Sequence, residues 1–86
     1  MVSYLPFWKT TVQKNISTYT LIQKYGIAPS TIQRLRDFEY VSVRTLDELC
    51  QILDCQIEDL VEILPDGSQD IATLKQLAQQ LRTNDK

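Results

Sequence analysis

The sequence predicts an all-α fold, with five helices in one domain and a short amphipathic helix after it. Apolar residues recur at helical spacing along almost the whole chain, and the two glycines and three prolines stand where helices would begin or end. No segment alternates as a strand does, so no strand is predicted. A chain of 86 residues that is 43% hydrophobic fits one small domain with a compact core.

The first helix is expected from about Pro6 to Lys14. Proline is tolerated in the first turn, because the N–H that it lacks would have no helical partner there. Phe7, Trp8 and Val12 form the apolar stripe of this helix, and we interpret Trp8 as a core residue.

The second helix is expected to begin at Ser17 and to end before Gly26. The Ser17 hydroxyl can accept a hydrogen bond from the first turn, and Ile16 and Leu21 have the spacing of a hydrophobic staple. Gly26 supplies the positive φ of a tight turn. Four residues are expected to face the core: Leu21, Ile22, Tyr25 and Ile27.

The third helix starts at Pro29 and turns Ile32 and Leu35 inward, which leaves a polar face with Ser30, Gln33 and Arg34 on the opposite side. Ser42 can cap a fourth helix over about Val43 to Leu53. Its inward residues are Leu46, Leu49, Cys50 and Leu53.

A fifth helix is expected over Gln56 to Leu64, because Ile57, Leu60, Val61 and Leu64 have helical spacing and Pro65-Asp66-Gly67 would stop it. These elements define a domain over residues 1–66.

Residues 67–86 form a predicted C-terminal helical tail. At about 12 residues its helix is too short to be stable alone, so it either folds back on the domain or pairs with a second chain or a partner, and we favour pairing. The expected tail interface is the stripe Ile71, Leu74, Ala78 and Leu81.

Composition argues against an enzyme and against a bound cofactor or metal. The chain has no histidine and only two cysteines, too few for a structural zinc site. We interpret Cys50 and Cys55 as core residues of a reducing compartment rather than a disulfide. The N-terminal residues resemble no signal peptide, and no apolar run approaches the ~20 residues of a membrane span, so we expect a cytoplasmic protein.

Charge is divided unevenly between the two halves of the chain. Residues 1–44 carry six basic and two acidic side chains, a net charge of +4, whereas residues 45–86 carry three basic and nine acidic side chains, a net charge of −6. One half therefore suits a polyanion despite the overall charge of −2.

The run GIAPSTIQRL, with VSVRTLDELCQIL and IEDLVEILPD downstream, resembles the small helix-turn-helix regulators of the lambda-repressor-like, Xre/Cro type. The resemblance covers residues 1 to about 66. It implies double-stranded DNA as the partner, with a base-reading set of Pro29, Ser30, Gln33 and Arg34. It also implies a phosphate-binding set of Thr18, Thr31, Ser42 and Arg44.

Three features depart from the family pattern. Phe38 stands where the family commonly has the glycine that ends the reading helix, and Ile22 stands where a small residue usually lets two helices approach. Asp37 and Glu39 place acids near the expected phosphate path, and Phe38-Glu39-Tyr40 is expected to be exposed and able to contact a protein.

The leading hypothesis is a sequence-specific transcriptional regulator, a repressor-like homodimer that reads the major groove with the helix from Pro29. The alternative is a protein-interaction adaptor, antitoxin-like or antirepressor-like, that keeps the fold and binds a partner through the tail or through Phe38–Tyr40.

Overall fold

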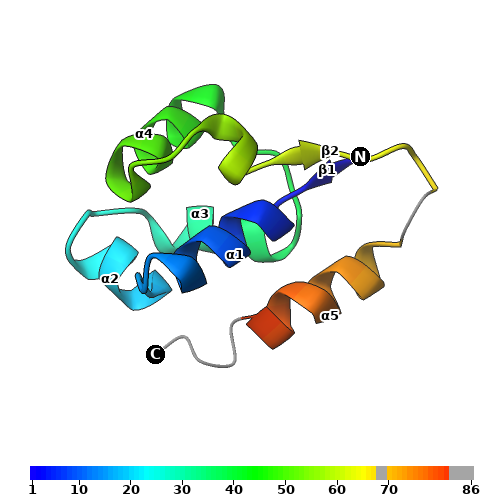
Figure 1. The fold of residues 1–86 in the computed structure, drawn as a ribbon, viewed down its shortest axis with the longest axis horizontal. Helices are drawn as coiled ribbons and strands as arrows, with labels where there is room; N and C mark the ends of the chain where they lie inside the picture. Colours follow the sequence, from blue (N-terminus) through cyan, green and yellow to red (C-terminus); the bar gives the residue numbers. More distant parts are fainter. Residues whose placement is uncertain (68–69, 82–86) are drawn as a thin grey trace.

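The structure, a computed structural model, describes residues 1–67 and 70–81 and is mainly helical (Figure 1). The helices are α1 (Leu5–Gln13), α2 (Thr18–Gln23), α3 (Pro29–Arg36), α4 (Val43–Leu53) and α5 (Ile71–Leu81). A single 3-10 turn, η1 (Ile57–Asp59), and two short strands, β1 (Val2–Ser3) and β2 (Glu62–Ile63), complete the described elements. The all-α class is confirmed, with a strand pair that the sequence did not predict. The predicted tail also spans residues 68–69 and 82–86, which lie outside the described residues.

Helix α1 lies at the centre of the core. Phe7 and Trp8 are completely buried, and their rings meet edge to face with centroids 4.8 Å apart. The N–H groups of the first turn find partners outside the helix: Leu5 N donates to Ser3 Oγ at 3.3 Å, and Phe7 N donates to the Leu60 carbonyl at 3.1 Å. The prediction for Val12 was wrong, because its side chain is 45% exposed on the outer side of α1.

The predicted helix over Gln56 to Leu64 is not formed. The chain makes only η1 there and then extends into β2, which pairs antiparallel with β1 in the register Val2–Ile63 and Ser3–Glu62. Leu60 is fully buried and its carbonyl accepts from Phe7 N, so the chain is held against the start of α1 instead of continuing as a helix. Short apolar runs of this kind fit a helix or a strand equally well, and the pairing partner decides between them.

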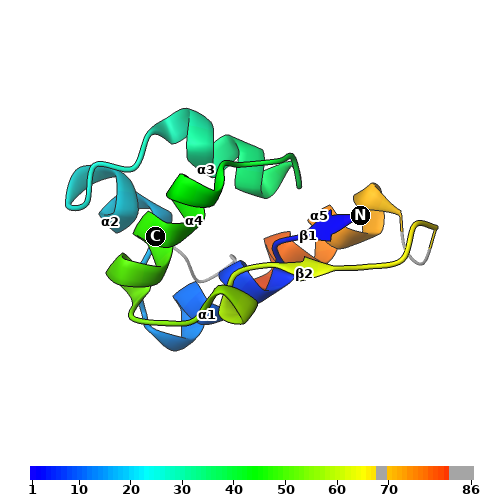
Figure 2. The ribbon, with the colours of Figure 1, turned by 90° about the horizontal axis from the view of Figure 1, so that it is seen from above.

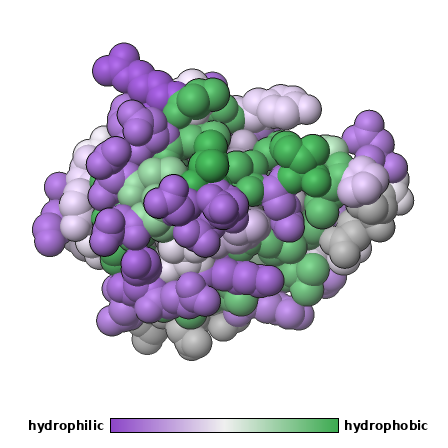
Figure 3. Space-filling view, turned by 45° about the horizontal axis from the view of Figure 1, so that its top comes forward, coloured by the Kyte–Doolittle hydropathy of each residue, from purple (hydrophilic) through white to green (hydrophobic). Residues whose placement is uncertain are grey.

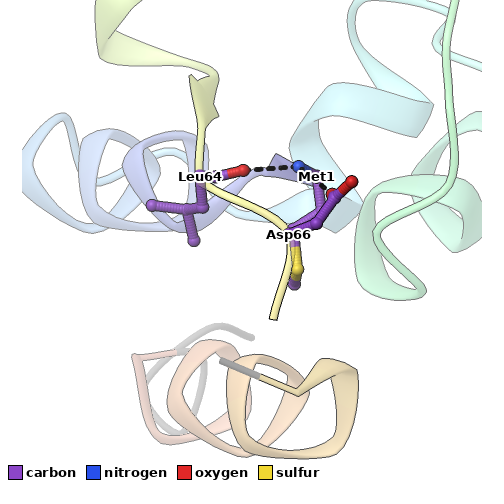
Figure 4. Close-up of polar contacts among 3 residues, drawn as sticks. All are labelled: Met1, Leu64 and Asp66. Atoms are coloured by element: carbon purple, nitrogen blue, oxygen red, sulfur yellow. Dashed lines mark hydrogen bonds and ion pairs between the residues drawn. The ribbon is translucent and has the colours of Figure 1, made fainter. Parts of the chain in front are cut away.

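The strand pair is closed at its outer end by Met1 (Figure 4). The Met1 carbonyl accepts from Leu64 N at 2.8 Å, and its ammonium donates to the Leu64 carbonyl at 2.5 Å. The ammonium also forms an ion pair with Asp66 Oδ1 at 3.1 Å. Ser3, which is fully buried, donates from Oγ to Glu62 Oε2 at 2.9 Å. These bonds join the first three residues to residues 62–66.

Helices α2 and α3 lie next to each other along one edge of the molecule, joined by a short turn (Figure 2). Ser17 caps α2 as predicted, because its Oγ accepts from Thr20 N at 3.1 Å. Gly26 has a φ of +74°, and Ile27 beyond it is buried. Tyr25, which was expected to face inward, is 40% exposed, because α2 ends before it and the turn directs its side chain outward.

Helix α4 has the predicted bounds and the predicted cap, since Ser42 Oγ accepts from Thr45 N at 3.1 Å. The predicted core residues Leu46, Leu49 and Leu53 are buried. Cys50 and Cys55 are free thiols, half-buried against the core. Burial and the neighbouring Cys50 raise the pKa of the Cys55 thiol to about 11, so it is a poor nucleophile at neutral pH.

Helix α5 folds back on the domain and packs against α1 (Figure 1). Leu74 and Ala78 are buried in the common core, whereas Ile71 is 39% exposed and Leu81 is half-buried. Asp70 caps the helix by accepting from Thr73 N at 2.7 Å. Of the two alternatives for the tail, folding back is therefore the one that the described residues adopt. None of the helices in these residues is long and apolar enough to cross a membrane.

Removal of the Leu74 side chain tests whether α5 belongs to the core. Because Leu74 is fully buried, Leu74→Ala should lower the free energy of unfolding by ~2–5 kcal/mol in urea titrations. The matched control is Leu77→Ala on the same helix, where the side chain is 39% exposed and the loss should be below ~1 kcal/mol. Equal losses in the two variants would contradict the packing described here.

Candidate nucleic-acid interface

The outward face of α3 is polar and is not used by the core. Ile32 and Leu35 are buried on the inner side, at 1% and 0% exposure. All four predicted base-reading residues are exposed and lie together in the first six residues of the helix: Pro29, Ser30, Gln33 and Arg34. The helix thus presents an amide, a guanidinium and a hydroxyl on one face, which are the groups that can recognise base edges.

The predicted phosphate-binding residues lie at the starts of three helices. Thr18 and Thr31 are half-buried in the first turns of α2 and α3. Ser42 caps α4, and Arg44 in its first turn is 89% exposed, 3.6 Å from Glu48 Oε1. An exposed ion pair of this kind holds Arg44 weakly, so its guanidinium can leave Glu48 and pair with a phosphate instead.

Helix α3 ends at an unusual residue. Phe38 follows the helix with a φ of +57°, the left-handed conformation that glycine adopts without strain. Its side chain is 5% exposed and packs edge-on against Tyr4, with ring centroids 6.0 Å apart. The Tyr4 hydroxyl donates to the Glu39 carbonyl at 2.7 Å. The burial of Phe38 therefore offsets the backbone strain that a glycine would avoid.

The prediction that Phe38, Glu39 and Tyr40 are all exposed was wrong for Phe38, because its ring fills the space beside Tyr4. Glu39 and Tyr40 are exposed, Tyr40 to 81%. A protein contact at this loop would thus involve Tyr40 rather than Phe38.

Two polar contacts at the end of α3 join residues that sequence reasoning did not connect. Gln33 Nε2 donates to Asp37 Oδ2 at 3.0 Å, and Lys75 Nζ of α5 lies 3.4 Å from Asp37 Oδ1. The hydrogen bond from Gln33, and after it the ammonium of Lys75, holds the pKa of the Asp37 carboxyl below its usual value. The spacing of Gln33 and Asp37 is a helical i,i+4 pair that the sequence could have indicated, whereas nothing in the sequence pointed to Lys75.

Comparison with known proteins agrees with this geometry. The sequence profile of the Cro/C1-type HTH DNA-binding domain matches residues 7–66. The chain belongs to this Cro/C1-type helix-turn-helix family. A crystal structure of the transcriptional regulator VanUg is similar, with a TM-score of 0.69 and 32% sequence identity over 76% of this chain and 87% of that one. Among curated proteins, none matches the chain. Within the Cro/C1-type domain, α2 and α3 are the two helices of the helix-turn-helix.

The left-handed backbone of Phe38 predicts that a glycine variant at this position is more stable than an alanine variant, the reverse of the usual order. Phe38→Ala should lose ~3–5 kcal/mol of unfolding free energy through the lost ring. Phe38→Gly should be the more stable of the two by ~1 kcal/mol, because glycine adopts this φ without strain. Thermal and urea unfolding would measure both, with Tyr40→Ala as an exposed control that changes stability little. If the alanine variant is more stable than the glycine variant, the backbone of residue 38 is not strained as described.

Proposed function

We propose that the chain is a cytoplasmic, sequence-specific transcriptional regulator that binds double-stranded DNA with α3 in the major groove. The observation that supports this most directly is the exposed polar face of α3 in a domain of the Cro/C1-type family. A helix face that only needed to be solvated would not require Gln33, Arg34 and Ser30 side by side. The VanUg structure, of a transcriptional regulator, supports the same role.

In the proposed complex, base recognition comes from the first six residues of α3. Arg34 donates two hydrogen bonds to guanine, Gln33 pairs with adenine, and Ser30 bonds to either. Pro29 gives this end of the helix a rigid backbone against the base edges. Each well-formed bidentate pair discriminates against a wrong base by ~1–3 kcal/mol.

The phosphate contacts fix the position of α3 but carry no sequence information. Thr18, Thr31 and Ser42 stand at helix starts, where backbone N–H groups favour an anion, and Arg44 adds a full positive charge. Residues 1–44, which contain α3 and Arg44, carry a net charge of +4, and this charge supports binding to a polyanion.

The regulator is proposed to act as a repressor-like homodimer, which occupies two half-sites about one helical turn, ~34–36 Å, apart. Apolar side chains outside the core support self-association. Figure 3 shows hydrophobic residues gathered near the strand pair, and Ile63 of β2 is 77% exposed. Of the predicted tail interface, Ile71 and Leu81 remain accessible, whereas Leu74 and Ala78 would have to leave the core.

A protein-interaction adaptor is the second candidate function, favoured by the net charge of −6 in residues 45–86 and by the exposed Tyr40. Salt separates the two candidates. Binding through several phosphates should fall steeply between ~50 and ~200 mM salt, whereas a complex held by apolar contacts should change little.

Selection of bound duplexes from a random DNA pool at ~100 mM salt tests the proposed function. Specific sites should be bound ~10³-fold or more above non-specific DNA, and a homodimer should enrich a palindrome. A folded protein that enriches no sequence would overturn the proposal in favour of the adaptor.

On the enriched duplex, two arginine variants should behave differently. Arg34→Ala should cost ~1–3 kcal/mol of binding free energy and relax the preference at one base pair, whereas Arg44→Ala should weaken all sequences about equally. Titrations against a panel of single-base variants measure both effects, with Lys9→Ala on α1 as a control for the loss of one positive charge. Loss of affinity without a change of preference in Arg34→Ala would contradict the base-reading assignment.

A further inference from the structure

The amide of Gln33 has a defined orientation on the surface of α3. Its Nε2 donates to Asp37 Oδ2 at 3.0 Å, four residues further along the helix. An ionised carboxylate can only accept, so the nitrogen end of the amide must face Asp37. The second N–H and the Oε1 atom of Gln33 are then left for another partner. This donor and acceptor pair is what the N7 and N6 edge of adenine requires.

The carboxylate that orients Gln33 is partly neutralised from another helix. Lys75 Nζ lies 3.4 Å from Asp37 Oδ1, and the two side chains are 45% and 35% exposed. Lys75 is held in place because its neighbours Leu74 and Ala78 on α5 are buried in the core. The lowered pKa of the Asp37 carboxyl, caused first by Gln33 and then by Lys75, is consistent with both contacts.

An unpaired carboxylate at this position would oppose DNA binding, because it stands beside the residues proposed to enter the groove and would repel the phosphates. The positive charges of Lys75 and of the neighbouring Arg36 oppose this repulsion, and the carboxylate keeps the oxygen that accepts from Gln33. Exposed ion pairs add little to folding stability, so a contribution to the fold accounts poorly for the contact.

We propose that Asp37 is a positioning residue that orients the Gln33 amide for adenine, and that Lys75 of α5 makes this acid compatible with the DNA backbone. The inference rests on the proposed function and adds to it a residue pair that touches neither base nor phosphate. It assigns α5 a part in DNA recognition through a charge that it supplies to the end of α3.

The first experiment measures base preference on the selected duplex. Gln33→Ala identifies the base pair that Gln33 reads. At that base pair alone, Asp37→Ala should reduce the preference for adenine roughly 5-fold, because the amide loses its fixed orientation. Asp37→Asn can donate as well as accept, so it no longer excludes the flipped Gln33 amide and should retain only part of the preference. If Asp37→Ala leaves the preference unchanged, the positioning role is wrong.

The second experiment is a double-mutant cycle between positions 37 and 75, read as affinity for the same duplex. Lys75→Ala should weaken binding to every sequence, and Asp37→Asn should restore affinity more in the Lys75→Ala background than in the wild type. Lys9→Ala is the matched control, since it removes the same charge from α1, and Asp37→Asn should give no extra recovery there. Additive effects at 37 and 75 would overturn the role of Lys75.

A measurement without DNA separates this inference from the proposed function. The pKa of the Asp37 carboxyl, followed by carbon NMR, should rise in Gln33→Ala and in Lys75→Ala and stay unchanged in Lys9→Ala. A wild-type chain that selects no duplex would overturn the proposed function and the reading role together. If the chain selects DNA but the pKa of Asp37 is the same in Gln33→Ala and Lys75→Ala as in the wild type, this inference alone is overturned.

Discussion

The attachment of residues 60–64 to the start of the chain is the constraint on which the rest of the structure depends. The Leu60 carbonyl satisfies Phe7 N in the first turn of α1, and the β1–β2 pair continues this contact outward to Met1. Because an unpaired N–H in a buried helix start is costly, the two chain segments stabilise each other. The attachment also determines where the chain leaves β2, and α5 returns from there to cover α1.

The sequence predicted the elements that local signals determine. Serine caps at Ser17 and Ser42 and the proline at Pro29 marked the starts of α2, α4 and α3. The stretch from Gln56 to Leu64 was mispredicted because its form depends on a hydrogen bond to Phe7, 53 residues before Leu60 in the chain. The outward face of α3 was predictable from its period, but the contact of Lys75 with Asp37 depends on how α5 docks.

The inner side of α3 packs in the core, and its outer side carries the residues proposed to contact DNA. Ile32 and Leu35 anchor α3, and Phe38 ends it while adding a ring to the same core. The end of α3 is thereby joined to Tyr4, the residue just before α1. A helix held at its inner face and at its end can present Gln33 and Arg34 with little loss of backbone freedom on binding.

The ion pair between α5 and α3 has a consequence for how related sequences diverge. Under the proposed roles, a lysine at position 75 makes an acid at position 37 compatible with DNA, and that lysine is no longer needed for this purpose once the acid is absent. The two positions should therefore be exchanged together during evolution, although one caps the end of α3 and the other lies in α5. Drift in a segment outside the helix-turn-helix would then be coupled to change in the operator that the protein recognises.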